Sequence, residues 1–256
     1  MTNAAGTGSP STVKIWILAA RLRTLPAAVA PVLVGTALAS TLADAFSVLA
    51  FLATLAGSLL IQVGTNLAND YSDARRGADT EERLGPVRVT AGGLVPPSQV
   101  LLATYLTFGL AVLVGIYLIS ISGWPLLVVG LLSILAGVLY TGGPRPYGYA
   151  GFGEIFVFLF FGLVAVAGTY YVQTVEVNWQ AIALAVPVGL LASAILVVNN
   201  VRDIDTDRRA GKNTLAVRLG REKSRTLFAA MVLLSFPLAL VPSLFGDLSF
   251  WPGLSW

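Results

Sequence analysis

The chain has 256 residues, of which 56% are hydrophobic and 11% are charged, and its formal net charge is +3. Soluble domains carry roughly one-quarter charged residues, so this composition excludes an ordinary soluble protein. The sequence contains neither Cys nor His, which excludes disulfides and thiolate or imidazole metal sites. Any bound metal must therefore be held by oxygen, and Mg²⁺ is the first candidate.

Seven apolar segments recur along the chain, with the length that a helix needs to cross about 30 Å of hydrocarbon. They lie at approximately Thr24–Ser40, Phe46–Leu67, Val100–Ile119, Pro125–Tyr140, Ile155–Val172, Ala181–Val198 and Leu227–Phe245. Barrel strands would alternate and be half as long, so we predict an all-α, polytopic bundle of transmembrane helices. Residues 1–12 are small and polar and are expected to form a disordered tail, and residues 13–256 a single transmembrane domain.

The Lys and Arg residues determine the expected topology. All 16 lie before the first span or in the loops after the second, fourth and sixth spans. Because short cytoplasmic loops retain positive charge, we expect the N-terminus and these loops on the cytoplasmic side of the plasma membrane. The basic character then reflects this asymmetry and a lipid bilayer partner, and nothing in the sequence suggests nucleic-acid binding.

Two polar segments resemble each other and indicate an internal repeat. Residues 66–77 read NLANDYSDARRG, and residues 199–210 read NNVRDIDTDRRA. Both contain Asn-x-x-x-Asp, another Asp three or four residues on, and then Arg-Arg. The first segment ends the second span and the other ends the sixth, so we predict two parallel pseudo-repeats of about four helices each.

The repeated Asn and Asp residues are the candidate metal ligands. They fall at i, i+4 and i+7 in the first motif and at i, i+4 and i+8 in the second, so each set would share one helix face. Carboxylates stacked at the end of a membrane helix repel one another, and cations must offset that repulsion. Two facing clusters would hold Mg²⁺ ions that bridge to a diphosphate. The candidate ligands are Asn66, Asp70, Asp73, Asn199, Asp203 and Asp207.

Cations near the motifs could bind the diphosphate oxygens, or could simply anchor the topology. The candidates are Lys212, Arg83, Arg88 and Arg21. Among the other acids, Asp205, Glu81 and Glu82 are expected to be solvated loop residues, and Asp79 is undecided.

The loop 140–154 is rich in Gly, Pro and Tyr, and Glu154 opens the next helix. It could be a lid whose aromatic faces meet a carbocation or an aromatic ring. Equally, it could be a turn with an interfacial aromatic belt.

These motifs resemble those of the UbiA-type intramembrane aromatic prenyltransferases, whose signature is the paired Asn-x-x-x-Asp on helices two and six. The finer resemblance is to the menaquinone branch, the 1,4-dihydroxy-2-naphthoate polyprenyltransferases. It rests on residues 66–73 (NLANDYSD), 85–88 (GPVR), 140–144 (YTGGP), 147–154 and 199–221. The resemblance extends from about residue 15 to about residue 245.

The resemblance implies that Mg²⁺ ionises a polyprenyl diphosphate, and that the allylic cation alkylates 1,4-dihydroxy-2-naphthoate with loss of its carboxylate, giving demethylmenaquinone. It implies that the six Asn and Asp residues hold the metal, and that Lys212, Arg83 and Arg21 bind diphosphate. The group that activates the acceptor stays open among Asp73, Tyr140 and Tyr149. The expected catalytic residues are Asp70, Asp73, Asp203, Asp207, Tyr140 and Tyr149. The family has nine helices, so with seven spans we expect a C-terminally shortened domain.

Other functions are compatible with parts of this pattern. A UbiA-type enzyme could use another acceptor, such as 4-hydroxybenzoate, haem or chlorophyllide. A CDP-alcohol phosphotransferase is disfavoured because its Asp-Gly-x-x-Ala-Arg pattern does not occur. A transporter with internal repeats would use the acids to bind a coupling ion, but its helices should break near mid-membrane, whereas these acids lie at helix ends.

Overall fold

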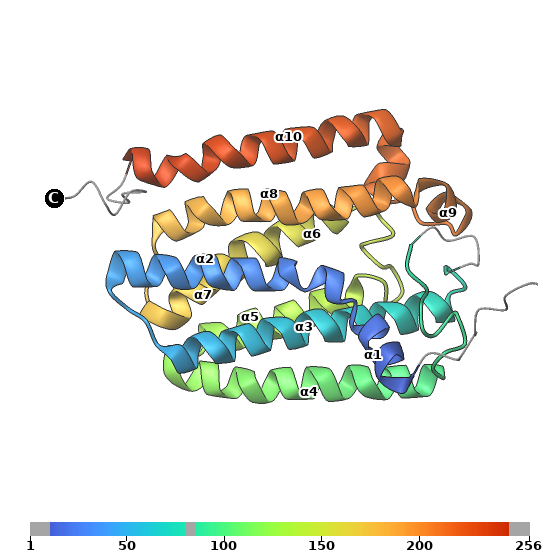
Figure 1. The fold of residues 1–256 in the computed structure, drawn as a ribbon, viewed down its shortest axis with the longest axis horizontal. Coiled ribbons are helices and arrows are strands. Elements are labelled where there is room, and N and C mark those ends of the chain that lie inside the picture. Colours follow the sequence, from blue (N-terminus) through green and yellow to red (C-terminus); the bar gives the residue numbers. More distant parts are fainter. Residues whose placement is uncertain (1–10, 80–84, 246–256) are drawn as a thin grey trace, which may run out of the picture.

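The computed structural model describes residues 11–79 and 85–245, which form a bundle of helices with no strand among them. Figure 1 shows the long helices lying side by side, with the short helices α1 and α9 toward one end of the bundle. In chain order the elements are α1 (Thr12–Ala20), η1 (Leu22–Thr24), α2 (Pro26–Ala43), α3 (Val48–Arg75), α4 (Pro97–Ser122), α5 (Pro125–Leu139), α6 (Gly153–Val157), the π-helix η2 (Phe158–Val164), α7 (Ala165–Thr174), α8 (Trp179–Arg202), α9 (Ile204–Arg209) and α10 (Leu215–Phe245).

The predicted membrane spans are present as helices. Within the described residues, six segments are long and apolar enough to cross a membrane, namely α2, α3, α4, the continuous α6–η2–α7 segment, α8 and α10. The seventh predicted span is α5, which has 15 residues. The chain is therefore a multi-pass membrane protein with the all-α architecture that its hydropathy predicts.

The surface of the bundle is apolar where lipid would meet it. Leu102, Leu106 and Leu113 of α4 are each more than half exposed. In water such a face would be costly, but against hydrocarbon it has no such cost. Buried polar and charged side chains lie inside the bundle, among them Asp70, Asp73, Glu154, Asp203 and Lys212.

Proline and left-handed residues set several helix boundaries. Pro26, Pro97 and Pro125 lie in the first turns of α2, α4 and α5, where the missing N–H has no helical partner to lose. Asp44 (φ 48°) ends α2 and Gly123 (φ 85°) ends α4 in positive-φ conformations.

The N-terminal boundary differs slightly from the predicted one. The side chain of Ser11 accepts a hydrogen bond from the Lys14 backbone N–H, and Thr12 is already helical. The helical part therefore begins one residue earlier than predicted, and residues 1–10 of the predicted tail lie outside the described residues.

The two halves run in parallel, as the repeat predicts. In Figure 1, α3 and α8 both run toward the end of the bundle that carries α9, so their polar motifs reach the same end. α3 packs on α4, and α8 packs on α10 and η2. A core cluster that includes Leu38, Val166, Tyr170 and Ala185 joins α2, α7 and α8.

The π-helix lies directly against α8. A Cβ atom built on Gly162 would lie 2.6 Å from the Cα atom of Gly189, so any side chain there would push the two helices apart. Near the motif end, Ser193 Oγ of α8 donates a hydrogen bond to the carbonyl oxygen of Glu154 at 3.0 Å. These contacts hold the start of α6 beside the second motif.

Candidate active site

A cavity of about 1270 Å³ lies inside the bundle, and both polar motifs line it. Apolar side chains from α2, α3, α4, α5, η2 and α8 form much of the remaining wall. Arg83 lies outside the described residues, as do Glu81 and Glu82. The other predicted site residues all line this cavity, namely Arg21, Asn66, Asp70, Asp73, Arg88, Tyr140, Tyr149, Asn199, Asp203, Asp207 and Lys212.

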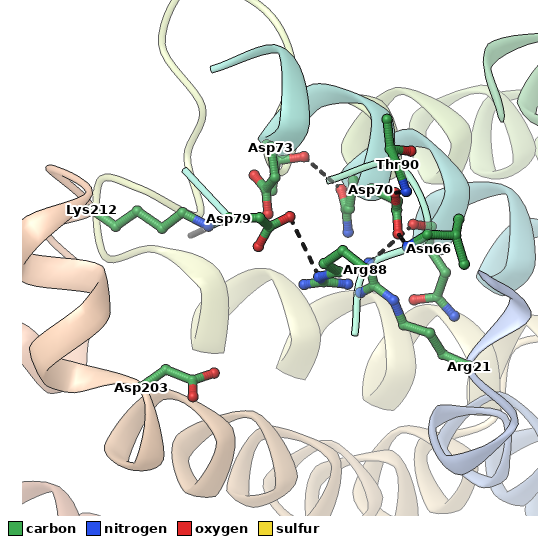
Figure 2. Close-up of polar contacts among 12 residues, drawn as sticks. Arg21, Asn66, Asp70, Asp73, Asp79, Arg88, Thr90, Asp203 and Lys212 are labelled. Atoms are coloured by element: carbon green, nitrogen blue, oxygen red, sulfur yellow. Dashed lines mark hydrogen bonds and ion pairs between the residues drawn. The ribbon is translucent and has the colours of Figure 1, made fainter. Parts of the chain in front are cut away.

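Asp70 joins α3 to the segment that follows it. Its carboxylate is 1% exposed, and it accepts hydrogen bonds from the backbone N–H groups of Thr90 (2.9 Å) and Val89 (3.2 Å), one at each oxygen. Figure 2 shows Thr90 beside Asp70. A carboxylate has about four lone-pair sites, so these two bonds leave acceptor capacity on both oxygens. Asp70 can therefore position the 85–96 segment and also face a cation.

Asp73 connects the two halves of the molecule. Its Oδ1 accepts a hydrogen bond from the Tyr149 hydroxyl at 2.6 Å, and its Oδ2 lies 3.1 Å from Lys212 Nζ. Figure 2 shows Lys212 extending from the second half toward the first motif. The Lys212 ammonium also lies 4.7 Å from the centre of the Tyr149 ring. The buried Lys212 and Asp73 and the partly buried Tyr149 therefore form one cluster.

The side chain of Asn66 is oriented by the last residues of α1 and η1. Its Nδ2 donates to the Ala20 carbonyl and to Thr24 Oγ1, both at 3.0 Å. Arg21, held at φ 54° between α1 and η1, donates to the backbone carbonyl oxygen of Asn66 at 3.3 Å. Because the amide nitrogen is committed to these acceptors, its oxygen is the atom available to a ligand in the cavity.

The second motif does not lie on one unbroken helix, which corrects the predicted arrangement. α8 ends at Arg202, and Asp203 lies at the junction with α9. The i to i+4 spacing nevertheless survives, because Asp203 N donates to Asn199 O (3.1 Å) and Asp207 N donates to Asp203 O (2.8 Å). The three side chains still line the cavity. The Asp203 carboxylate accepts two hydrogen bonds from the Arg202 guanidinium, at 2.8 and 2.7 Å.

The acids that the sequence analysis treated separately have different environments. The Asp79 side chain is 2% exposed and lies 3.6 Å from Arg88 Nε, so it belongs to the charged interior of the site. Asp205 pairs with Arg221 at 3.1 Å, but their side chains are 67% and 45% exposed, as expected for a loop acid.

Aromatic side chains form one wall of the cavity. Tyr147 stacks on Phe156 with 3.9 Å between ring centres, and meets Tyr140 edge to face at 5.4 Å. Burial, and then the neighbouring Asp73 carboxylate, raise the pKa of the Tyr149 phenol above its ordinary value. Tyr149 is therefore favoured as a neutral hydrogen-bond donor.

Comparison with known proteins identifies the family. The UbiA prenyltransferase family matches residues 28–256. The chain belongs to the UbiA prenyltransferase family. The predicted family resemblance is thereby confirmed.

Relatives and solved structures agree with this family assignment. The 1,4-dihydroxy-2-naphthoate octaprenyltransferase of Mycobacterium tuberculosis is 47% identical, covering 88% of this chain and 77% of the relative. The protein of the same description from Escherichia coli is 40% identical, covering 94% and 80%. A UbiA homolog from Archaeoglobus fulgidus bound to GPP and Mg²⁺ superposes with a TM-score of 0.72 at 15% identity, covering 91% of this chain and 79% of that chain. This superposition shows a shared fold.

The donor set of this UbiA-family protein fits a hard cation. The cavity combines Asp carboxylates with amide groups, and the sequence has no Cys or His to compete. The amide oxygen of Asn66 is left to the cavity by the hydrogen bonds of its nitrogen. Among residues 11–79 and 85–245, no three acids gather closely enough to hold an ion by themselves. An ion here would therefore draw ligands from amides and from a substrate as well as from carboxylates.

Sequence reasoning missed two polar pairs, one buried and one partly buried. Thr141 Oγ1 donates to Asn69 Oδ1 at 2.9 Å, and Asn200 Nδ2 donates to Glu154 Oε1 at 2.9 Å. Asn69 and Asn200 stand inside the two motifs, so their polarity in an apolar helix was the available signal. Their partners lie 72 and 46 residues away in sequence, and no local pattern predicts them.

Proposed function

We propose that this chain transfers a polyprenyl group from polyprenyl diphosphate to 1,4-dihydroxy-2-naphthoate in an Mg²⁺-dependent reaction, releasing CO₂ and diphosphate and giving demethylmenaquinol, the quinol whose separate oxidation yields demethylmenaquinone. The observation that carries the proposal is that both acidic motifs line one cavity, which continues into the apolar interior. We infer the acceptor from the menaquinone-branch relatives, which are 39–47% identical over most of the chain.

The depth of the cavity suits a long isoprenoid. Its lining follows α3 from Asp73 down to Thr54, which is about 28 Å at 1.5 Å per helical residue. That length is close to the thickness of the hydrocarbon core, about 30 Å. A diphosphate at the motif end could therefore leave its apolar tail inside the bundle, away from water.

The polar residues form two proposed groups, metal ligands and diphosphate-binding cations, and Asp73 and Lys212 also belong to the cluster that would activate the acceptor. Asn66, Asp70, Asp73, Asn199, Asp203 and Asp207 would hold Mg²⁺, which when bound supplies positive charge to a diphosphate leaving group. Lys212, Arg88 and Arg21 line the same cavity and would offset the diphosphate charge directly, and Arg83 is proposed with them. Without these cations the carboxylates would repel the substrate.

The reaction breaks one bond to the prenyl carbon and makes another. The allylic C–O bond breaks and diphosphate leaves with the electron pair. The ring carbon that bears the carboxylate attacks the allylic carbon, and loss of CO₂ returns an electron pair to the ring. Tyr140 and Tyr147 line the cavity, and we assign their aromatic rings to stabilising the developing allylic cation.

The cluster of Asp73, Tyr149 and Lys212 is the proposed site for activating the acceptor. Tyr149 donates a hydrogen bond to Asp73 and is favoured in its neutral form, so we assign Asp73 as the group that would take the proton of the acceptor hydroxyl and return it as CO₂ leaves. Tyr149 would then orient both the acceptor and the Asp73 carboxylate.

We also propose that the motif end faces the cytoplasm in the plasma membrane. The support is the charge asymmetry of the sequence, since every Lys and Arg lies before the first predicted span or between predicted spans two and three, four and five, or six and seven. A cysteine placed in the 120–124 loop should then be labelled from outside the cell, and one placed in the 208–211 loop should not.

The function is tested by product formation in membranes that contain the chain. Polyprenyl diphosphate and 1,4-dihydroxy-2-naphthoate should give prenylated naphthoquinol and CO₂ with Mg²⁺, and neither with EDTA. Prenylation of 4-hydroxybenzoate in place of the naphthoate would refute the acceptor. Product that persists in EDTA would refute the metal requirement.

A further inference from the structure

Glu154 is a buried acid that the proposed reaction does not use. It is the second residue of α6 and is 4% exposed. Its Oε1 accepts the hydrogen bond from Asn200, whereas its Oε2 is buried and has no hydrogen-bond partner among the described residues. Burying such a group costs free energy, and native structures retain few of them without a reason.

The contact with Glu154 determines which way the Asn200 amide points. A carboxylate accepts hydrogen bonds and cannot donate them, so the NH₂ group must turn toward Glu154. The amide oxygen is bonded to the same carbon and therefore points elsewhere. Asn200 lines the main cavity, so this orientation offers an oxygen to the cavity.

In the first half of the molecule, hydrogen bonds orient the amide of Asn66 in the same way. The NH₂ group of Asn66 is held by the Ala20 carbonyl and Thr24 Oγ1, which leaves its oxygen for the cavity. Sequence alignment of the repeats pairs Asn66 with Asn199, but the hydrogen bonding pairs it with Asn200. Asn199 also borders a separate apolar groove, between α8 and α10, that Phe228 helps to line.

We propose that Asn200 is a further oxygen ligand of the metal–diphosphate site and that Glu154 is a positioning residue that orients its amide. This inference rests on the proposed function. It completes a two-sided site in which each half contributes carboxylates and one amide oxygen held in place by protein acceptors. Carboxylate partners of this kind commonly fix the orientation of groups that bind metals.

The test measures Mn²⁺ binding to the purified full chain in detergent by electron paramagnetic resonance, with inorganic diphosphate present. Asn200→Ala and Glu154→Met should each weaken Mn²⁺ binding by about tenfold or more. Glu154→Gln should bind within about twofold of wild type, because its side-chain carbonyl still accepts from Asn200. Ser193→Ala is the structural control, since it removes the α6–α8 hydrogen bond and leaves the amide in place.

Three results separate the inference from its alternatives. Wild-type Mn²⁺ affinity in Asn200→Ala overturns the inference. If Glu154→Met lowers the melting temperature as Ser193→Ala does but leaves the Mn²⁺ affinity unchanged, Glu154 has only a structural role. That result overturns its positioning role. Asp203→Asn reports on the proposed function itself, because unchanged binding there would mean that the metal site is wrong as a whole.

Discussion

Replacing Lys212 with Met tests the buried link between the two halves. Lys212 Nζ lies 3.1 Å from Asp73 Oδ2, and the two side chains are 10% and 2% exposed. Removing one partner of a buried pair leaves an uncompensated charge, at a cost of about 3–5 kcal/mol. The exposed pair of Arg221 and Asp205, at 45% and 67% exposure, should contribute at most about 1 kcal/mol. Arg221→Met is therefore the matched control.

The assay is equilibrium unfolding in mixed micelles, combined with turnover. Lys212→Met should lower the free energy of unfolding by about 3 kcal/mol or more. The double variant Lys212→Met/Asp73→Asn should be less destabilised than the sum of the single variants, because it leaves neither charge buried. Lys212→Met should also raise the KM for polyprenyl diphosphate about tenfold, since one charge-assisted contact is lost. If Lys212→Met costs no more stability than Arg221→Met, the reasoning about burial is refuted.

Three further changes test other parts of the site. Asp70→Asn should lower turnover of polyprenyl diphosphate with 1,4-dihydroxy-2-naphthoate about 100-fold or more while the protein still folds. Wild-type turnover would remove Asp70 from the proposed metal ligands. Gly115 lines the cavity and has open space where a Cβ would stand, so Gly115→Leu should lower activity with long prenyl diphosphates more than with short ones. Gly109 lies on the lipid-facing side of α4, so Gly109→Leu should leave the ratio of the two activities unchanged. The pKa of Tyr149 is raised from 10.0, so its contribution to stability should be constant below about pH 10 and decline above it; a stability difference between wild type and Tyr149→Phe that begins to change near pH 7 would contradict this assignment.

Local sequence patterns predict most of the membrane architecture and the pairing of the two polar motifs. Hydropathy alone predicts the seven spans, because lipid requires about 20 apolar residues per helix whatever their neighbours are. The repeated motif predicts that Asp70 and Asp203 share a site, since both end spans that run in the same direction. The break in the helix at Asp203 was not predicted, because its spacing fits a continuous helix equally well.

From the amino-acid sequence alone come the approximate positions of the apolar helices, the oxygen-only donor set and the positions of the two motifs along the chain. Which polar groups meet depends on the packing of the folded bundle. Asp73 reaches Lys212 across 139 residues, and Asn200 reaches Glu154 across 46. Helical periodicity predicts neighbours three or four residues apart, whereas these pairs depend on how whole helices pack. Those long-range contacts orient the carboxylates and amides, and thereby turn a pattern of polar residues into a site.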